Sequence, residues 1–270
     1  MDRQTQSIIA YPGTLVKSLE VVWGAGFLSP GGPAEVREML IGLDLTDRSV
    51  LDIGCGIGGV DLLLAQEHGA AQVIGIDLQP ALLAIATARA AAVDLSDRVT
   101  FQFVSHGQLP FADQTFDLVF SKDALLHTAD KLTYFADVLR VLKPGGWFVG
   151  SDGLKGTQPG EAARLAYQVA LGLPVYWESL TSYGTLLQQV GFTEIQLRDR
   201  SAWFQEAVRQ DNARIFGPLK PALIALVGTE AYAAWVKTRQ AMQNAVTAGE
   251  LTTGHFRARK SHHSAQKPQG

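Results

Sequence analysis

From residue 49 to residue 151 the chain alternates short apolar runs with longer segments of helical spacing. Apolar runs bounded by glycine, proline and polar residues predict buried strands, and apolar positions three or four residues apart predict helices. This alternation is typical of a doubly wound, mostly parallel sheet with helices on both faces. The predicted strands are, in chain order, 50–53, 73–77, 99–104, 116–120 and 147–151.

The residues around this alternation predict two further strands and several helices. Helices are expected after Pro12, from Pro33, over 181–190 and across most of 202–248, and strands over 193–198 and 253–259. The expected α/β fold is therefore a seven-stranded sheet with a helical cap. Its expected parts are an N-terminal lid segment (1–48), the α/β core (49–152), a substrate cap (153–190), C-terminal strands and helices that complete the sheet (191–260), and a disordered tail (261–270).

Composition narrows the classes of function. A net charge of −3 and a pI near 6.1 give no electrostatic signature of nucleic-acid binding or of an anionic membrane partner. A single cysteine, Cys55, excludes an internal disulfide, and no Cys/His cluster has the spacing of metal ligands. The sequence shows no signal-peptide core and no run long enough to span a bilayer, so a cytoplasmic protein is expected. The oligomeric state is not predicted.

A glycine-rich turn follows the first predicted strand. Gly54, Gly56 and Gly59 fit the Gly-x-Gly-x-x-Gly pattern of dinucleotide sites, because glycines let the backbone N–H groups approach a ligand. Asp52 and the additional Gly58 favour a ligand that carries a cationic amino group as well as a carboxylate and an adenosine. S-adenosylmethionine is such a ligand; an NAD-dependent oxidoreductase and an ordinary glycine turn are the alternatives.

An acidic residue ends the second predicted strand. Asp77 lies 23 residues beyond Gly54, where a carboxylate either binds both ribose hydroxyls of a nucleoside or caps the following helix. The nearby glycine turn favours the ribose interpretation. Ligands of open α/β sheets lie across the carboxyl ends of the strands. The segments 105–111 and 121–127, which follow the next two strands, are therefore expected to line the same crevice.

Four sequence motifs together resemble class I S-adenosylmethionine-dependent methyltransferases. They are Asp52-Ile-Gly-Cys-Gly-Ile-Gly-Gly, Asp77, Phe116-Asp-Leu-Val and Leu142-Lys-Pro-Gly-Gly. A narrower resemblance, to the phosphoethanolamine methyltransferases, covers nearly the whole chain. It rests on Ser29-Pro-Gly-Gly, Ser121-Lys-Asp-Ala-Leu-Leu-His and Gly254-His-Phe-Arg-Ala-Arg-Lys.

The narrower resemblance implies roles for individual residues. It implies a tyrosine–histidine dyad at Tyr11 and His127 that closes the site over substrate and cofactor. The implied cofactor contacts, with Gly56 added from the glycine turn, are Leu28, Ser29, Asp52, Gly54, Gly56, Asp77, Leu78 and Lys122. The acid that usually holds the adenine amine is replaced here by Ser105 or His106. The tyrosine that the family places after the fifth strand, for the substrate phosphate, is Gly153.

Methyl transfer from a sulfonium is an in-line displacement, so the protein chiefly aligns the acceptor and removes its proton. Alignment supplies roughly 7–11 kcal/mol, and a general base about 10²–10⁴-fold. His127 is the candidate base, or else has only structural bonds at a helix start. Asp123 either holds the nucleophile or Tyr11, or caps a turn. Trp23, Phe27, Tyr176 and Trp177 either form an acceptor cage or pack in the core.

These residues predict S-adenosylmethionine-dependent transfer of a methyl group to a small molecule, with S-adenosylhomocysteine as product. An amine nitrogen is the favoured acceptor, and an oxygen or an activated carbon is the alternative. A nucleic-acid methyltransferase is disfavoured, because 121–124 lacks an acidic or Asn-Pro-Pro-aromatic box. A non-catalytic cofactor-binding protein is also compatible with the sequence.

Overall fold

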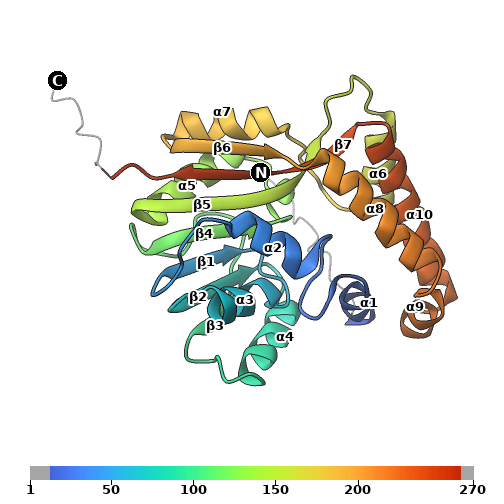
Figure 1. Cartoon of the computed structure of the whole chain (residues 1–270), viewed down its shortest axis with the longest axis horizontal. Coiled ribbons are helices and arrows are strands. Elements are labelled where there is room, and N and C mark those ends of the chain that lie inside the picture. Colours follow the sequence, from blue (N-terminus) through green and yellow to red (C-terminus); the bar gives the residue numbers. More distant parts are fainter. Residues whose placement is uncertain (1–12, 263–270) are drawn as a thin grey trace, which may run out of the picture.

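A seven-stranded sheet forms the centre of the computed structural model, which describes residues 13–262 (Figure 1). The strand order is β3-β2-β1-β4-β5-β7-β6, and β7 runs antiparallel to both of its neighbours while β1 to β5 pair in parallel. The strands are β1 (Ser49–Ile53), β2 (Gln72–Asp77), β3 (Val99–Phe103), β4 (Phe116–Lys122), β5 (Leu142–Lys155), β6 (Thr193–Asp199) and β7 (Leu251–Arg259). The predicted fold class is confirmed.

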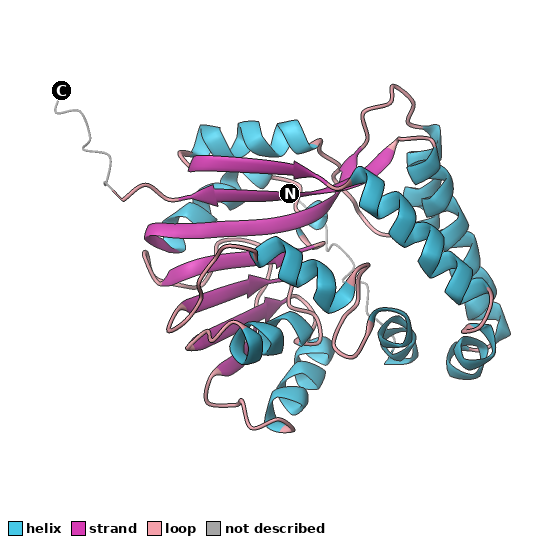
Figure 2. Cartoon of the chain, viewed as in Figure 1, coloured by secondary structure: helices cyan, strands magenta, loops and turns pink. Residues whose placement is uncertain are grey.

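Helices cover both faces of the sheet and extend beyond one end of it (Figure 2). One face carries α2 (Gly32–Leu40), α3 (Gly59–Glu67) and α4 (Pro80–Ala91), and the other carries α5 (Lys131–Val141) and α7 (Leu180–Val190). The remaining helices are α1 (Gly13–Trp23), the short 3₁₀ helix η1 (Leu125–His127), α6 (Ala162–Leu171), α8 (Ser201–Phe216), α9 (Lys220–Val227) and α10 (Thr229–Thr247).

Strand alternation divides the core into two layers. Val50 and Leu118 face α2 and α3, whereas Leu51 and Val119 face α5. All four side chains are buried, which is expected for parallel strands covered by helices on both faces. The buried strands place their carboxyl ends, and the loops that follow them, at one edge of the sheet.

The structure divides the C-terminal half differently from the predicted substrate cap over 153–190. Strand β5 continues to Lys155 and pairs along its length with β7, so residues 153–155 belong to the sheet. Helix α7 packs on the face of the sheet and is not part of the cap, because its Tyr183 and Leu187 are fully buried in the α5 layer. The helical cap consists instead of α6, α8, α9 and α10, which pack on one another, with α1 against α9.

The described residues stop short of two predicted features. Tyr11 and most of the predicted tail, 263–270, lie outside the described residues. Between residues 13 and 262, no helix is long and apolar enough to cross a membrane.

Candidate active site

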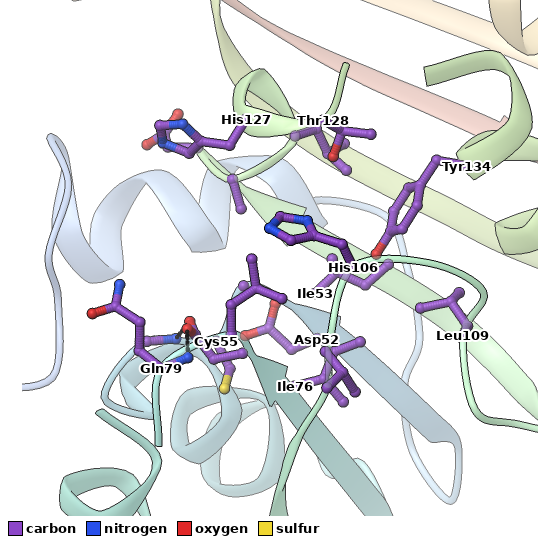
Figure 3. A pocket seen from close by; sticks show the side chains of 18 of the residues that line it. Asp52, Ile53, Cys55, Ile76, Gln79, His106, Leu109, His127, Thr128 and Tyr134 are labelled. Carbon is purple, nitrogen blue, oxygen red and sulfur yellow. Dashed lines mark hydrogen bonds between the residues drawn. The ribbon is translucent and has the colours of Figure 1, made fainter. Parts of the chain in front are cut away.

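A cavity of about 960 Å³ opens at the carboxyl ends of β1 to β4. Its walls come from the glycine turn after β1, the ends of β2 and β4, the 104–110 loop, one face of α5 and the 26–29 loop (Figure 3). The volume is at the upper end of the range for small-molecule sites. All predicted cofactor residues lie on this wall: Leu28, Ser29, Asp52, Gly54, Gly56, Asp77, Leu78, Ser105, His106 and Lys122.

The glycine turn has a conformation that side chains would prevent. Gly54, Gly56 and Gly58 have φ angles of 77°, 56° and 84°, in the left-handed region. A methyl group added at Gly54 would lie 2.3 Å from the Cβ of Ala124, so the turn and the segment after β4 are in direct contact. The N–H groups of Gly54 and Cys55 both donate to the carbonyl of Ile76, which fixes the turn to β2.

Asp77 holds the same turn from the side of β2. Its Oδ2 accepts the N–H of Gly56 at 3.0 Å, and its Oδ1 accepts the N–H of Gln79 at 2.9 Å. Burial raises the pKa of this carboxyl, and the backbone hydrogen bonds partly oppose that shift. Asp77 thus lines the cavity, as the ribose interpretation requires, and it fixes the glycine turn, but it does not cap α4, whose N-cap residue is Gln79.

Asp52 lies deeper in the wall and is only 2% exposed. Its Oδ2 atom has no hydrogen-bond partner among the described residues. Burial and the nearby Asp77 raise the pKa of the Asp52 carboxyl. A buried carboxyl oxygen without a donor is costly unless a neighbouring group supplies a hydrogen.

Lys122 joins the end of β4 to the N-terminal loop. Its ammonium group donates to Ser29 Oγ at 2.5 Å, to the Pro30 carbonyl at 3.0 Å and to Asp123 Oδ2 at 2.7 Å. The Gly59 N–H donates to the Gly26 carbonyl at 3.2 Å, so the loop is also bound to the start of α3. These contacts place the loop over the cavity, with Leu28 against Gly56.

His127 ends the 3₁₀ helix η1 and lies on the cavity wall (Figure 3). Its Nδ1 atom is 2.8 Å from the Pro174 carbonyl oxygen. Burial lowers the pKa of the imidazole, Lys131 lowers it further, and the Pro174 hydrogen bond raises it in part. The neutral imidazole is therefore favoured near neutral pH.

Asp123 lies beside His127 on the wall and has a positive φ of 56°. Its Oδ1 is 3.5 Å from Ser151 Oγ, and its other oxygen accepts from Lys122. Asp123 therefore contacts the cavity, and it also forms an ion pair that holds the β4 end.

The four aromatic residues that were predicted to bind the substrate do not lie together. Phe27 lies on the cavity wall, and Trp23, Tyr176 and Trp177 do not. The Trp23 indole N–H donates to Asp211 Oδ2 at 2.7 Å, and the Trp177 indole N–H to Gln168 Oε1 at 2.9 Å, which directs both rings into the cap. The Tyr176 N–H donates to the Leu126 carbonyl. Trp23 and Trp177 pack among the helices, as large apolar side chains usually do, whereas Tyr176 is exposed.

The sequence interpretation missed one face of α5. Thr133, Tyr134, Asp137 and Arg140 line the cavity from this helix. Figure 3 labels Tyr134 among the lining residues. Asp137 accepts the Leu109 N–H and pairs with Arg140, which also donates to the carbonyls of Leu109 and Phe111. The sequence did indicate that these residues share a helix face, because side chains three or four positions apart lie on one side of a helix.

Comparisons with known proteins agree with the fold and the cavity described above. Residues 50–146 match the family described as "Methyltransferase domain". Residues 50–146 therefore form a methyltransferase domain, and the chain is similar to class I S-adenosylmethionine-dependent methyltransferases. The chain is 32% identical to phosphoethanolamine N-methyltransferase 1 of Triticum aestivum over 93% of its own length and 50% of that protein. It is 31% identical to the Arabidopsis thaliana enzyme of the same name over 77% of this chain and 41% of the relative.

Solved structures give a similar result. Phosphoethanolamine N-methyltransferase 2 of Haemonchus contortus, in complex with phosphomonomethylethanolamine and S-adenosylhomocysteine, superposes with a TM-score of 0.86 at 27% identity. That match covers 93% of this methyltransferase and 58% of the nematode chain. The chain thus spans about half the length of the curated relatives it matches. The predicted class of enzyme and the resemblance to the phosphoethanolamine methyltransferases are confirmed.

Proposed function

We propose that the chain transfers a methyl group from S-adenosylmethionine to the amine nitrogen of a small molecule, with His127 as the base. This proposal rests on one observation: the proposed cofactor residues and the candidate base line the same cavity. The glycine turn, Asp52 and Asp77 line one part of it, and His127 and Asp123 line another. A cofactor site and a candidate base therefore open into the same space.

The residues of the wall fit the cofactor. The Asp52 carboxyl group, which lines the cavity, is suited to accept from the α-ammonium group, and Asp77 to accept from the ribose hydroxyls. Gly54 and Gly56 keep the backbone open to the amino-acid part. Leu28, Ser29, Leu78 and Lys122 would surround the remainder, and Ser105 or His106 would accept from the adenine amine.

When bound, the cofactor supplies a methyl group on a positively charged sulfur, whose leaving group takes the electron pair of the broken C–S bond. The acceptor nitrogen needs a free lone pair to form the new C–N bond. His127 would take the proton of the acceptor ammonium at Nε2, because Nδ1 already donates to the Pro174 carbonyl. Asp123 would orient the acceptor nitrogen by accepting one of its hydrogens.

The charges on the wall support an amine rather than an anionic group as the recognised part of the acceptor. Among the described lining residues, the only Lys or Arg side chains are Lys122 and Arg140. All three ammonium donors of Lys122 are used within the protein, and Arg140 pairs with Asp113 and Asp137 and donates to two carbonyls. Asp123 and Asp137 on the same wall offset the charges of these two cations.

The test is an acceptor panel with purified protein and S-adenosylmethionine, with S-adenosylhomocysteine release as the readout. The panel pairs each free amine with its phosphorylated form, including ethanolamine with phosphoethanolamine, and adds small phenols and activated carbon acids. Turnover of amines supports the proposal. Turnover confined to the oxygen or carbon acceptors would overturn the amine assignment, and turnover confined to phosphorylated amines would overturn the argument from wall charge.

A further inference from the structure

Asp61, on the first turn of α3, is completely buried and was not assigned a role from the sequence. Both of its carboxyl oxygens lack a hydrogen-bond partner among the described residues, and so does Oδ2 of Asp52. Asp52 is the register partner of Gly75 on β2, and a methyl group on Gly75 would lie 2.5 Å from Asp61 Oδ1, so the two carboxyl groups lie close together on the α3 side of the sheet. Two carboxylates cannot form a hydrogen bond, since both only accept; one carboxylate and one carboxylic acid can.

We propose that Asp61 is a positioning residue that keeps one proton between its own carboxyl group and that of Asp52. Asp52 then stays ionised toward the cofactor, and the Asp61 O–H donates a hydrogen bond that fixes the orientation of its carboxylate. This inference rests on the proposed cofactor site and extends it to a second layer of residues, because Asp61 does not line the cavity.

The surroundings favour a shared proton. Asp77 on β2 adds a third carboxyl group, and the Cys55 thiol of the glycine turn lies beside the pair. The neighbours from β3 and β4 are the uncharged Phe101 and Phe120. Lys122, the cation at the end of β4, pairs with Asp123 instead. Burial raises the pKa of both carboxyls. The Asp52 charge raises the pKa of Asp61 further, whereas the hydrogen bond from Asp61 lowers that of Asp52, so the proton is assigned to Asp61.

Local packing also holds the Asp61 carboxyl in its place. A methyl group on Gly75 of β2 would lie 2.5 Å from Asp61 Oδ1 and 2.8 Å from the Cβ of Cys55. The carboxyl thus occupies the space that a side chain at position 75 would fill. The start of α3 favours negative charge, but burial and then the Asp52 charge raise the pKa of the Asp61 carboxyl.

The test compares variants at position 61 that keep or remove a hydrogen-bond donor. Asp61→Asn keeps an N–H donor toward Asp52, whereas Asp61→Ala and Asp61→Leu keep none. Calorimetric titration with S-adenosylhomocysteine is done from acid to mildly alkaline pH. Asp61→Asn is expected to bind within about threefold of the parent chain, and the donor-free variants about tenfold or more weakly at neutral pH.

The pH dependence separates positioning from packing. Without the donor, the pKa of Asp52 rises further, so affinity in Asp61→Ala and Asp61→Leu should recover as pH increases. A packing role predicts equal weakening of all three variants with no recovery, and that result would overturn the proposal. Asp61→Leu restores buried volume if the alanine variant folds poorly, and the exposed Asp97→Asn serves as a matched control.

An infrared difference spectrum of the ligand-free protein provides an independent readout. The parent chain at neutral pH should show a protonated carboxyl band that Asp61→Asn lacks. Its absence from the parent would overturn the shared proton. This measurement does not depend on the cofactor: a parent chain that shows the band but binds no S-adenosylhomocysteine would refute the proposed function and leave the carboxyl pair intact.

Discussion

The Nδ1 atom of His127 and the carbonyl oxygen of Pro174 lie 2.8 Å apart. Because a carbonyl only accepts hydrogen bonds, Nδ1 carries the hydrogen and the neutral ring keeps its lone pair at Nε2. The contact joins η1 to the segment that follows α6. The position of the candidate base therefore depends on a loop far from it in the sequence.

Replacing His127 with alanine should lower kcat while cofactor binding is retained. Loss of a general base costs about 10²–10⁴-fold in rate. The cofactor contacts proposed for Asp52, Asp77 and the glycine turn do not involve the imidazole. Steady-state kinetics with the best acceptor of the panel and calorimetry with S-adenosylhomocysteine provide the check. A variant that no longer binds the cofactor would show that His127 has a structural role.

The pH–rate profile should have an acidic limb set by His127. A base is active when neutral, and burial lowers the pKa of this imidazole below its usual value. The rate should therefore rise as pH increases through that lowered pKa, and it should already be level near neutral pH. Measurement of kcat against pH tests this. A midpoint clearly above the ordinary histidine value of about 6.5 would contradict the assignment.

Replacing Asp77 should affect the glycine turn as well as the cofactor. Asp77→Ala removes the acceptor for the Gly56 N–H and the proposed acceptor for the ribose hydroxyls, so cofactor binding should weaken by about 1–3 kcal/mol. Asp77→Asn keeps a carbonyl oxygen toward Gly56 and should retain more thermal stability than alanine. Calorimetry and thermal unfolding of both variants separate the two roles. Unchanged affinity in Asp77→Ala would refute the ribose contact.

Gly54→Ala should disrupt the turn for two reasons that can be separated. The new methyl group would lie 2.3 Å from the Ala124 Cβ, and the φ of 77° disfavours any L side chain by about 1–2 kcal/mol. The double variant Gly54→Ala with Ala124→Gly removes the contact and leaves the backbone cost. Denaturant unfolding should therefore show partial recovery in the double variant. Additive destabilisation would mean that the two positions do not contact each other.

The sheet could be predicted because its signals are local. Each parallel strand is a short apolar run that ends in a glycine turn or a polar segment, and residues such as Asp77 and Lys122 then follow from their place at a strand end. The cofactor part of the cavity could be predicted for the same reason. Its residues lie within a few positions of the carboxyl ends of β1, β2 and β4.

The cap and the second layer of the site depend on contacts between distant segments. Trp23 is directed by Asp211, and Trp177 by Gln168, so no local pattern shows that these aromatics face away from the cavity. Asp61 is equally concealed, because an acid on the first turn of a helix ordinarily lies at the surface. The pairing of β5 with β7 beyond Ser151 likewise has no signal in the sequence around residue 153.

The position of β7 determines when the sheet can be completed. β6 pairs only with β7, and β7 itself lies between β6 and β5. During synthesis, β5 therefore presents an unpaired edge until residues 251–259 have left the ribosome, well after the glycine turn has been made. The cofactor half can fold before these residues emerge, whereas the other half can close only after them, with the exposed β5 edge as the place where a folding intermediate would aggregate or recruit a chaperone.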